Sequence, residues 1–257
     1  MNPARAPRTA MVLAAGLGKR MRPLTETLPK PLLPVAGRTL LDRMLDRLAD
    51  ANLERVVINL HYFRAAMEAH LATRTSPPIE LSPELDLLET GGGVRNALPR
   101  LGAGAFYVAN ADVLWLDGKI PALARLARAW NDETMDALLL LHPAVTAIGY
   151  DGAGDYFIDA LGRLRRRRGA EVAPFIFAGV QILHPRLFAQ APEGAFSLNL
   201  LYDRAQQAGR LWGLRHDGLW FHVGTPQGLA ETEAVLDDLR RLSPGRNSSG
   251  VAVPAAS

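Results

Sequence analysis

The chain has 257 residues, 48% of them hydrophobic and 21% charged, which is the composition of a globular protein with a sizeable core. Its formal net charge of +3 is too small to indicate nucleic-acid binding by itself, and the lack of cysteine excludes disulfides, thiolate chemistry and cysteine-ligated zinc. No segment reaches the length of a transmembrane helix. We therefore expect a cytoplasmic protein, a monomer or small homo-oligomer, without nucleic-acid or membrane partners.

The N-terminus shares some features with a secretory targeting signal. Arg5 and Arg8 precede an apolar run at residues 10–15, as in a secretory signal, but the run is short and breaks at Gly16. Basic residues then stand where a cleavage site would be. We read residues 10–15 as the first buried strand instead.

Strands and helices alternate through most of the chain. Further strands are expected at residues 55–60, 79–81, 105–109, 136–141, 175–183, 211–214 and 219–223. Helices are expected at residues 40–48, 62–71, 120–130 and 198–208, after the glycines 91–93 up to residue 98, and from Pro226 with Thr225 as its cap. Residues 29–35 contain three prolines and are expected to be extended. The alternation predicts a Rossmann-like, doubly wound α/β fold with a mainly parallel sheet.

Two segments depart from this alternation. Residues 143–169 are rich in glycine and arginine, and we expect a small β-hairpin excursion beside the sheet. The run RRRR at residues 165–168 could contact phosphate or RNA, although a solvated turn is the simpler explanation. We expect one domain over residues 1–242 and a disordered tail over residues 243–257, which are rich in Ser, Gly, Pro and Ala.

The stretch LAAGLGKRMRP at residues 13–23 has the features of a phosphate-binding loop. A buried strand ends in two glycines, which let the backbone approach a ligand, and three basic side chains follow. Lysine occurs in the chain only as Lys19, Lys30 and Lys119, so two of the three lie in or near this stretch. The stretch is expected to hold a nucleoside triphosphate.

Two common phosphate-binding patterns do not fit this loop. A dinucleotide fingerprint would need a third glycine where Met21 stands, and a P-loop would need a lysine followed by Ser or Thr. A different loop remains, in which arginine supplies the charge.

Several motifs together resemble the signature of the sugar-1-phosphate nucleotidylyltransferases. They are LAAGLGKRM at residues 13–21, PKPL at 29–32, VAG at 35–37, ETGGG at 89–93, NAD at 110–112 and VGTP at 223–226. The ETGGG motif, the chain length and the run AGVQILHP at residues 178–185 most resemble the N-acetylmuramate-1-phosphate uridylyltransferases. Mannose-1-phosphate guanylyltransferases are the nearest competing group.

The resemblance implies a nucleotide-diphospho-sugar transferase fold and a reaction of a nucleoside triphosphate with a sugar-1-phosphate, with Mg²⁺ as cofactor. It implies that Arg20 stabilises the leaving pyrophosphate, Lys30 bridges the two phosphates and Asp112 holds the metal. The nucleotide-binding residues would be Ala14, Ala15, Gly16, Gly18, Glu89, Gly91, Gly92 and Asn110. The sugar-phosphate-binding residues would be Asp155, Gly179 and His222. The simpler explanations are that Arg20 is a surface arginine, that Lys30 is a solvated lysine and that Asp112 caps a helix.

His222 departs from the family pattern. The family usually has an aspartate at this position, two residues before the Gly-Thr pair, where it completes the metal site. A neutral imidazole is a poor magnesium ligand. His222 could lie by the metal with waters and phosphates completing the shell, contact the sugar phosphate as a cation, or weaken catalysis. Asp155 and Asp217 are candidates for the missing carboxylate, and a non-catalytic nucleotide-sugar sensor is the alternative function.

Overall fold

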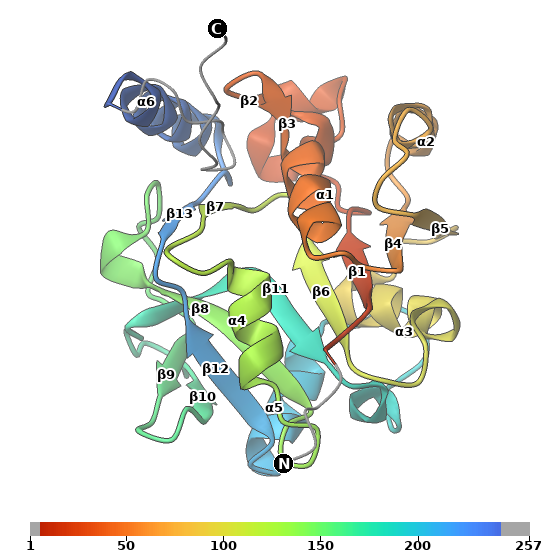
Figure 1. Ribbon diagram of the computed structural model, residues 1–257, viewed down its shortest axis with the longest axis vertical. Coiled ribbons are helices and arrows are strands. Elements are labelled where there is room, and N and C mark those ends of the chain that lie inside the picture. The colour runs from red at the N-terminus through yellow and green to blue at the C-terminus, as the bar shows by residue number, and fades with distance from the viewer. Residues whose placement is uncertain (1–5, 243–257) are drawn as a thin grey trace, which may run out of the picture.

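One mixed, mainly parallel sheet of nine strands organises residues 6–242, which are the residues that this computed structural model describes (Figure 1). Its strands are β1 (Thr9–Leu13), β4 (Arg55–Leu60), β5 (Ile79–Pro83), β6 (Phe106–Asn110), β8 (Ala137–Pro143), β9 (Tyr156–Ile158), β10 (Leu164–Arg166), β11 (Phe175–Leu183) and β12 (Leu211–Arg215). The predicted tail at residues 243–257 lies outside the described residues.

The sheet contains two parallel blocks joined by one antiparallel strand. In the first block β5, β4, β1 and β6 are parallel neighbours in that order. Strand β11 runs antiparallel to β6 on one side and to β8 on the other, and β12 pairs with β8 in parallel. The carboxyl ends of β1, β4, β5 and β6 therefore meet at one edge of the sheet, where ligands bind in open α/β sheets.

Helices cover both faces of the sheet. The helices are α1 (Leu40–Asp50), α2 (Arg64–Leu71), α3 (Glu89–Leu101), α4 (Ala122–Ala129), α5 (Asn199–Gln207) and α6 (Pro226–Leu242). Alternate residues of β1 face opposite layers: Val12 packs in the cluster with α1, α2 and α4, whereas Met11 packs in the cluster with α3 and α5. Figure 1 shows α1 and α4 on the viewer's side of the sheet. The predicted doubly wound α/β fold is confirmed.

The excursion expected at residues 143–169 is also confirmed, because β9 and β10 form an antiparallel hairpin that joins the sheet edge at Phe175. Thr225 caps α6, since its hydroxyl accepts a hydrogen bond from the Gly228 backbone N–H at 3.1 Å. None of the helices among residues 6–242 is long and apolar enough to cross a membrane.

The strand expected at residues 219–223 is present as β13 (Leu219–Phe221), which pairs outside the main sheet with the short strand β7 (Leu114–Leu116). Two other local expectations are wrong. The proline-rich passage makes one 3₁₀ turn, Lys30–Leu32, because a proline near the start of a turn gives up no hydrogen bond. Helix α3 begins at Glu89, so the three glycines lie inside its first turns.

These glycines allow α3 to pack closely on a neighbouring loop. The backbone N–H of Gly91 donates to the Phe196 carbonyl at 2.8 Å. A Cβ at Gly92 would overlap the carbonyl oxygen of Gly194, which is backbone and cannot rotate away. The glycines thus give up helix propensity in exchange for a close helix-loop contact.

The substitution Gly92→Ala is therefore expected to destabilise the protein by about 1–3 kcal/mol, because the overlap outweighs the better helix propensity of alanine. Chemical denaturation measures the free energy of unfolding. Gly104→Ala is the matched control, since a Cβ there meets no atom within 4 Å. Equal stabilities of the two variants would contradict the packing argument.

Candidate active site

A cleft of about 530 Å³ opens at the carboxyl edge of the sheet, where the polar ends of several strands converge. It is lined by residues 13–21, Lys30, Pro31, Asn59, Leu87, Glu89, Thr90, Asn110, Asp112, Ser197 and Gly224. The structure thus brings the predicted loop and the residues after β6 into one cavity, although they are about a hundred positions apart in the sequence. The β1–β6 pairing explains this, because Leu13 lies opposite Asn110.

The glycine loop is held by its own short contacts. Gly18 has a φ of 61°, a left-handed conformation that suits glycine, and it precedes the 3₁₀ turn Lys19–Met21. Its carbonyl accepts hydrogen bonds from the Met21 backbone N–H and the Thr25 hydroxyl, each at 2.9 Å. Met21 is fully buried, whereas Arg20 is exposed beside it and lines the cleft. The loop therefore presents Arg20 to the cleft from a fixed backbone.

Lys30 and Asp112 form the charged centre of the cleft. The Lys30 Nζ lies 2.6 Å from Asp112 Oδ2, and Lys30 is only 8% exposed. A lysine this buried needs an anionic partner, because the loss of hydration is otherwise uncompensated. Asp112 supplies that anion here, and the phosphate oxygens of a nucleotide carry the kind of negative charge that could do the same.

The opposite wall of the cleft comes from the start of α3. Glu89 has a φ of 58°, which is unusual for a residue other than glycine, and it lines the cleft with Thr90. Gly91 and Gly92 do not line the cleft, because both are buried and both donate their backbone N–H groups to the Phe196 carbonyl. Their role in nucleotide binding stays a prediction. In this geometry they could act only indirectly, by holding the start of α3 that carries Glu89 and Thr90.

Three other candidate residues, Gly179, Asp155 and Asp217, do not line the cleft. Gly179 has a φ of 79° and lies in the irregular part of β11, where a Cβ would come within 2.5 Å of Val113 Cγ1. The Asp155 carboxylate accepts a hydrogen bond from the Phe177 backbone N–H at 2.9 Å, and Asp217 pairs with Arg125 at 2.7 Å. Neither aspartate lines the cleft.

His222 lies next to the cleft but does not line it. Its ring covers Gly224, a lining residue at which any Cβ would overlap the His222 Nε2 atom. Burial and then the positive charges of Arg20 and Lys30 lower the pKa of His222. A lowered pKa favours the neutral imidazole, so the structure gives no support to a cationic role at neutral pH.

Sequence reasoning missed three lining residues: Asn59, Leu87 and Ser197. Gly224 belongs to the VGTP motif, but no binding role was predicted for it. The one signal for Asn59 was a polar residue at the end of an apolar strand, RVVINL. Ser197 approaches from the loop before α5, and no motif marks it.

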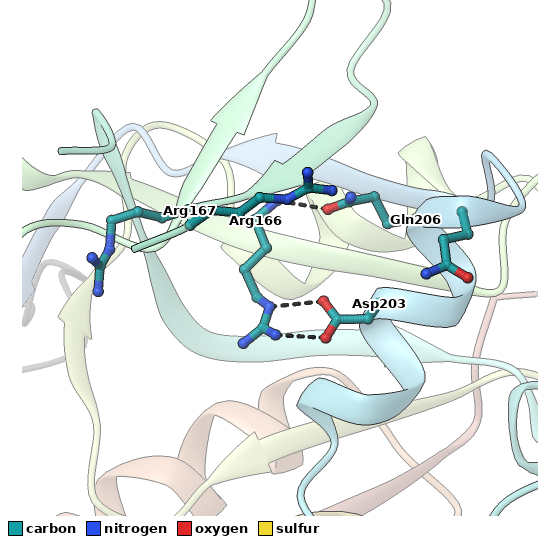
Figure 2. A pocket seen from close by; sticks show the side chains of 6 residues that line it. Arg166, Arg167, Asp203 and Gln206 are labelled. Carbon is teal, nitrogen blue, oxygen red and sulfur yellow. Dashed lines mark hydrogen bonds and ion pairs between the residues drawn. The ribbon is translucent and has the colours of Figure 1, made fainter. Parts of the chain in front are cut away.

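A smaller hollow of about 230 Å³ lies between β10 and α5, next to the arginine run at residues 165–168. Figure 2 shows Arg166 bound to both carboxylate oxygens of Asp203, at 2.8 and 2.5 Å. Arg165 pairs with Glu171, and Arg167 donates to the Gly154 carbonyl. These arginines are engaged with acceptors of the protein itself, which supports the simpler explanation of a solvated turn.

Residues 10–215 match the profile of the MobA-like NTP transferase domain. The chain belongs to this family. It is 45% identical over 236 residues to the N-acetylmuramate alpha-1-phosphate uridylyltransferase of Caulobacter vibrioides, covering 90% of this chain and 98% of the relative. It is 35% identical over 232 residues to the enzyme of the same name from Neisseria meningitidis, covering 88% of this chain and 97% of the relative. The predicted place among the sugar-1-phosphate nucleotidylyltransferases is confirmed.

Solved structures agree on the fold. A UDP-glucose pyrophosphorylase complexed with UDP-glucose superposes with a TM-score of 0.75 at 15% identity, over 91% of this chain and 99% of that chain. The inositol-1-phosphate CTP transferase from T. maritima gives a TM-score of 0.72 at 17% identity, over 91% and 97% of the two chains. The predicted nucleotide-diphospho-sugar transferase fold is therefore confirmed.

The donor set fits a magnesium ion that is held mainly by the substrate. Among residues 6–242 no group of three or more His, Cys, Asp or Glu side chains is placed to bind a metal. The carboxylates that line the cleft are those of Asp112, which follows β6, and Glu89 on the opposite wall. Mg²⁺ often uses one or two carboxylates together with phosphates and waters, so one carboxylate is sufficient.

Arg20→Ala is expected to lower kcat by about 10²–10³-fold, because it removes the positive charge that is predicted to stabilise the leaving pyrophosphate. The melting temperature should stay nearly unchanged, since the Arg20 side chain is exposed. Single-turnover pyrophosphate release measures the rate. Arg22→Ala is the matched control from the same loop, since Arg22 is exposed and does not line the cleft. Equal rates for both variants would contradict the role of Arg20.

A row of rings lies behind the site. His142 lies 5.7 Å from His216 and 6.2 Å from Trp220, whose ring is 5.9 Å from His222. Burial is the largest cause that lowers the pKa values of His142, His216 and His222 from about 6.5. The folded state therefore binds fewer protons than the unfolded state just below that pH.

Stability is accordingly expected to be greatest above about pH 7.5 and to fall as the pH drops through 6.5, because the unfolded histidines take up protons there first. His142→Gln should flatten this dependence, since it removes one of the groups. Urea denaturation between pH 5 and 8 gives the free energies of unfolding. A variant with the full pH dependence of the natural protein would exclude His142 as a contributor.

Proposed function

We propose that the protein transfers a uridylyl group from UTP to N-acetylmuramate α-1-phosphate, which yields UDP-N-acetylmuramate and pyrophosphate. The observation that supports this proposal is a cleft lined by Arg20 and by a buried Lys30 that pairs with Asp112. The chain is also similar over nearly its whole length to an N-acetylmuramate alpha-1-phosphate uridylyltransferase. N-acetylmuramate is a sugar of peptidoglycan. The reaction would therefore serve its recycling in the cytoplasm.

The proposed reaction is a single in-line displacement. A phosphate oxygen of the sugar-1-phosphate forms a bond to the α-phosphorus of UTP, and the bond from that phosphorus to the bridging β-phosphate oxygen breaks. The attacking oxygen is already deprotonated at neutral pH, so no general base is needed. The residues act by positioning and by neutralising charge.

Lys30 would contact both phosphates, because one ammonium can donate to two acceptors. Arg20, on the glycine loop, would bind the pyrophosphate as negative charge accumulates on it. Asp112 would hold Mg²⁺, which neutralises phosphate oxygens when it is bound. His222 would lie against the sugar-phosphate side as a neutral group, next to Gly224.

The substrate assignment is tested by pyrophosphate release from UTP, GTP, CTP and dTTP, each with N-acetylmuramate α-1-phosphate, mannose-1-phosphate and glucose-1-phosphate. UTP with N-acetylmuramate α-1-phosphate is expected to give the highest kcat/KM. Preference for GTP with mannose-1-phosphate would instead support a guanylyltransferase. Nucleotide binding without turnover for any pair would support a sensor.

His222→Asp is expected to keep the activity or raise it, and to lower the Mg²⁺ concentration needed for half-maximal rate, because a second carboxylate joins the metal site. Initial rates over a magnesium titration measure this. His222→Asn is the control, since it removes the ring without adding charge. Loss of turnover in the aspartate variant alone would show that a neutral side chain is required at this position.

A further inference from the structure

A buried polar network joins the ends of three neighbouring strands beneath the cleft. Asn59 is the penultimate residue of β4 and is 2% exposed, and Glu84 directly follows β5 and is 6% exposed. A buried amide and a buried carboxylate are costly without hydrogen-bond partners. Their partners therefore show what the two side chains hold in place.

The network runs from one wall of the cleft to the other. Asn59 Oδ1 accepts a hydrogen bond from the Ala14 backbone N–H at 2.8 Å, at the start of the glycine loop. Asn59 Nδ2 donates to Glu84 Oε1 at 2.7 Å. The other oxygen, Glu84 Oε2, accepts from the Leu88 backbone N–H at 3.1 Å, just before α3. Two side chains thus connect the glycine loop to the turn that carries Glu89.

Two further features match this network. A Cβ at Gly93 would come within 2.8 Å of both Asn59 Nδ2 and Glu84 Oε1, so the third glycine of the ETGGG motif leaves space for their hydrogen bond. Both donors to the Glu84 carboxylate are uncharged, and one of them lies at the positive end of α3. A helix N-terminus favours a carboxylate at that position.

We propose that Asn59 and Glu84 are positioning residues that hold the two walls of the nucleotide cleft at a fixed separation. The inference rests on the proposed function only in taking a nucleoside triphosphate as the ligand of the cleft. A cleft held open in advance binds more tightly, because the ligand does not have to order the loops. The hydrogen bonds of the network go to Ala14 and Leu88 and not to Lys30 or Asp112, so the network should affect nucleotide binding more than the chemical step.

Exchanging the amide of Asn59 and the carboxylate of Glu84 between the two positions tests this positioning role directly. Asn59→Asp keeps the acceptor for Ala14 but turns a carboxylate oxygen toward Glu84, which repels it. Adding Glu84→Gln restores the pattern in reverse: the new amide donates to the new carboxylate, and its oxygen accepts from Leu88. The double variant therefore has the same net charge and the same number of hydrogen bonds as the natural pair.

The Asn59→Asp variant is expected to raise KM for the nucleotide by about tenfold or more, and kcat should change by less than about threefold. The double variant should return KM to within about threefold of the natural value. Hydrogen exchange gives a second readout that needs no substrate. The Ala14 and Leu88 amides should exchange faster together in the single variant and be protected again in the double variant.

Asn96→Asp is the matched control, because Asn96 Nδ2 donates at 3.3 Å to Ser82 on the same helix-sheet contact, away from the cleft. It should change neither KM nor the exchange of the two amides. If Asn59→Asp folds poorly, Glu84→Gln alone provides the single variant. A single variant with natural KM, or a double variant as impaired as the single one, would overturn the proposal. Lack of turnover with UTP in the natural protein would count against the proposed function, whereas the exchange pattern would still decide the network.

Discussion

A nearly buried ammonium group is the constraint on which the cleft depends. Lys30 is removed from water, and its positive charge is balanced by the Asp112 carboxylate at 2.6 Å. Removing one partner of such a pair costs far more folding free energy than the intact pair contributes, because it leaves a buried charge without compensation. The same requirement makes the cleft receptive to phosphate. In the proposed reaction, substrate oxygens would take over part of the role of Asp112, and its carboxylate would then be available to a metal.

The parallel sheet provides the frame for this charge pair. Strands β1 and β6 are neighbours, so the loop after one and the aspartate after the other meet at the same edge. Gly18 and Met21 then fix the backbone that presents Arg20, while the 3₁₀ turn Lys30–Leu32 turns the lysine inward. The opposite wall is tied to this frame through buried side chains at the ends of β4 and β5. Each element of the cleft is thus anchored in the core, although its tip is exposed.

Much of this arrangement follows from the sequence. Alternating apolar runs predict the sheet and its helices, and glycines followed by basic residues predict the phosphate loop, because each signal is local. The Asn59–Glu84 contact joins a residue of β4 to the residue that follows β5, and no spacing rule reveals it. The ETGGG motif predicts an important site, but the tight contact of Gly92 with the loop at Gly194 depends on tertiary packing. Strand β13 likewise has the composition of a sheet strand and finds a different partner.

A double-mutant cycle on Lys30→Met and Asp112→Asn tests the central claim most directly, with kcat/KM from pyrophosphate release as the readout. If the two residues handle the phosphates as one unit, the double variant should lose no more activity than the worse of the single variants. Losses that multiply would show that lysine and aspartate act independently. That result would contradict a cleft organised around their pairing.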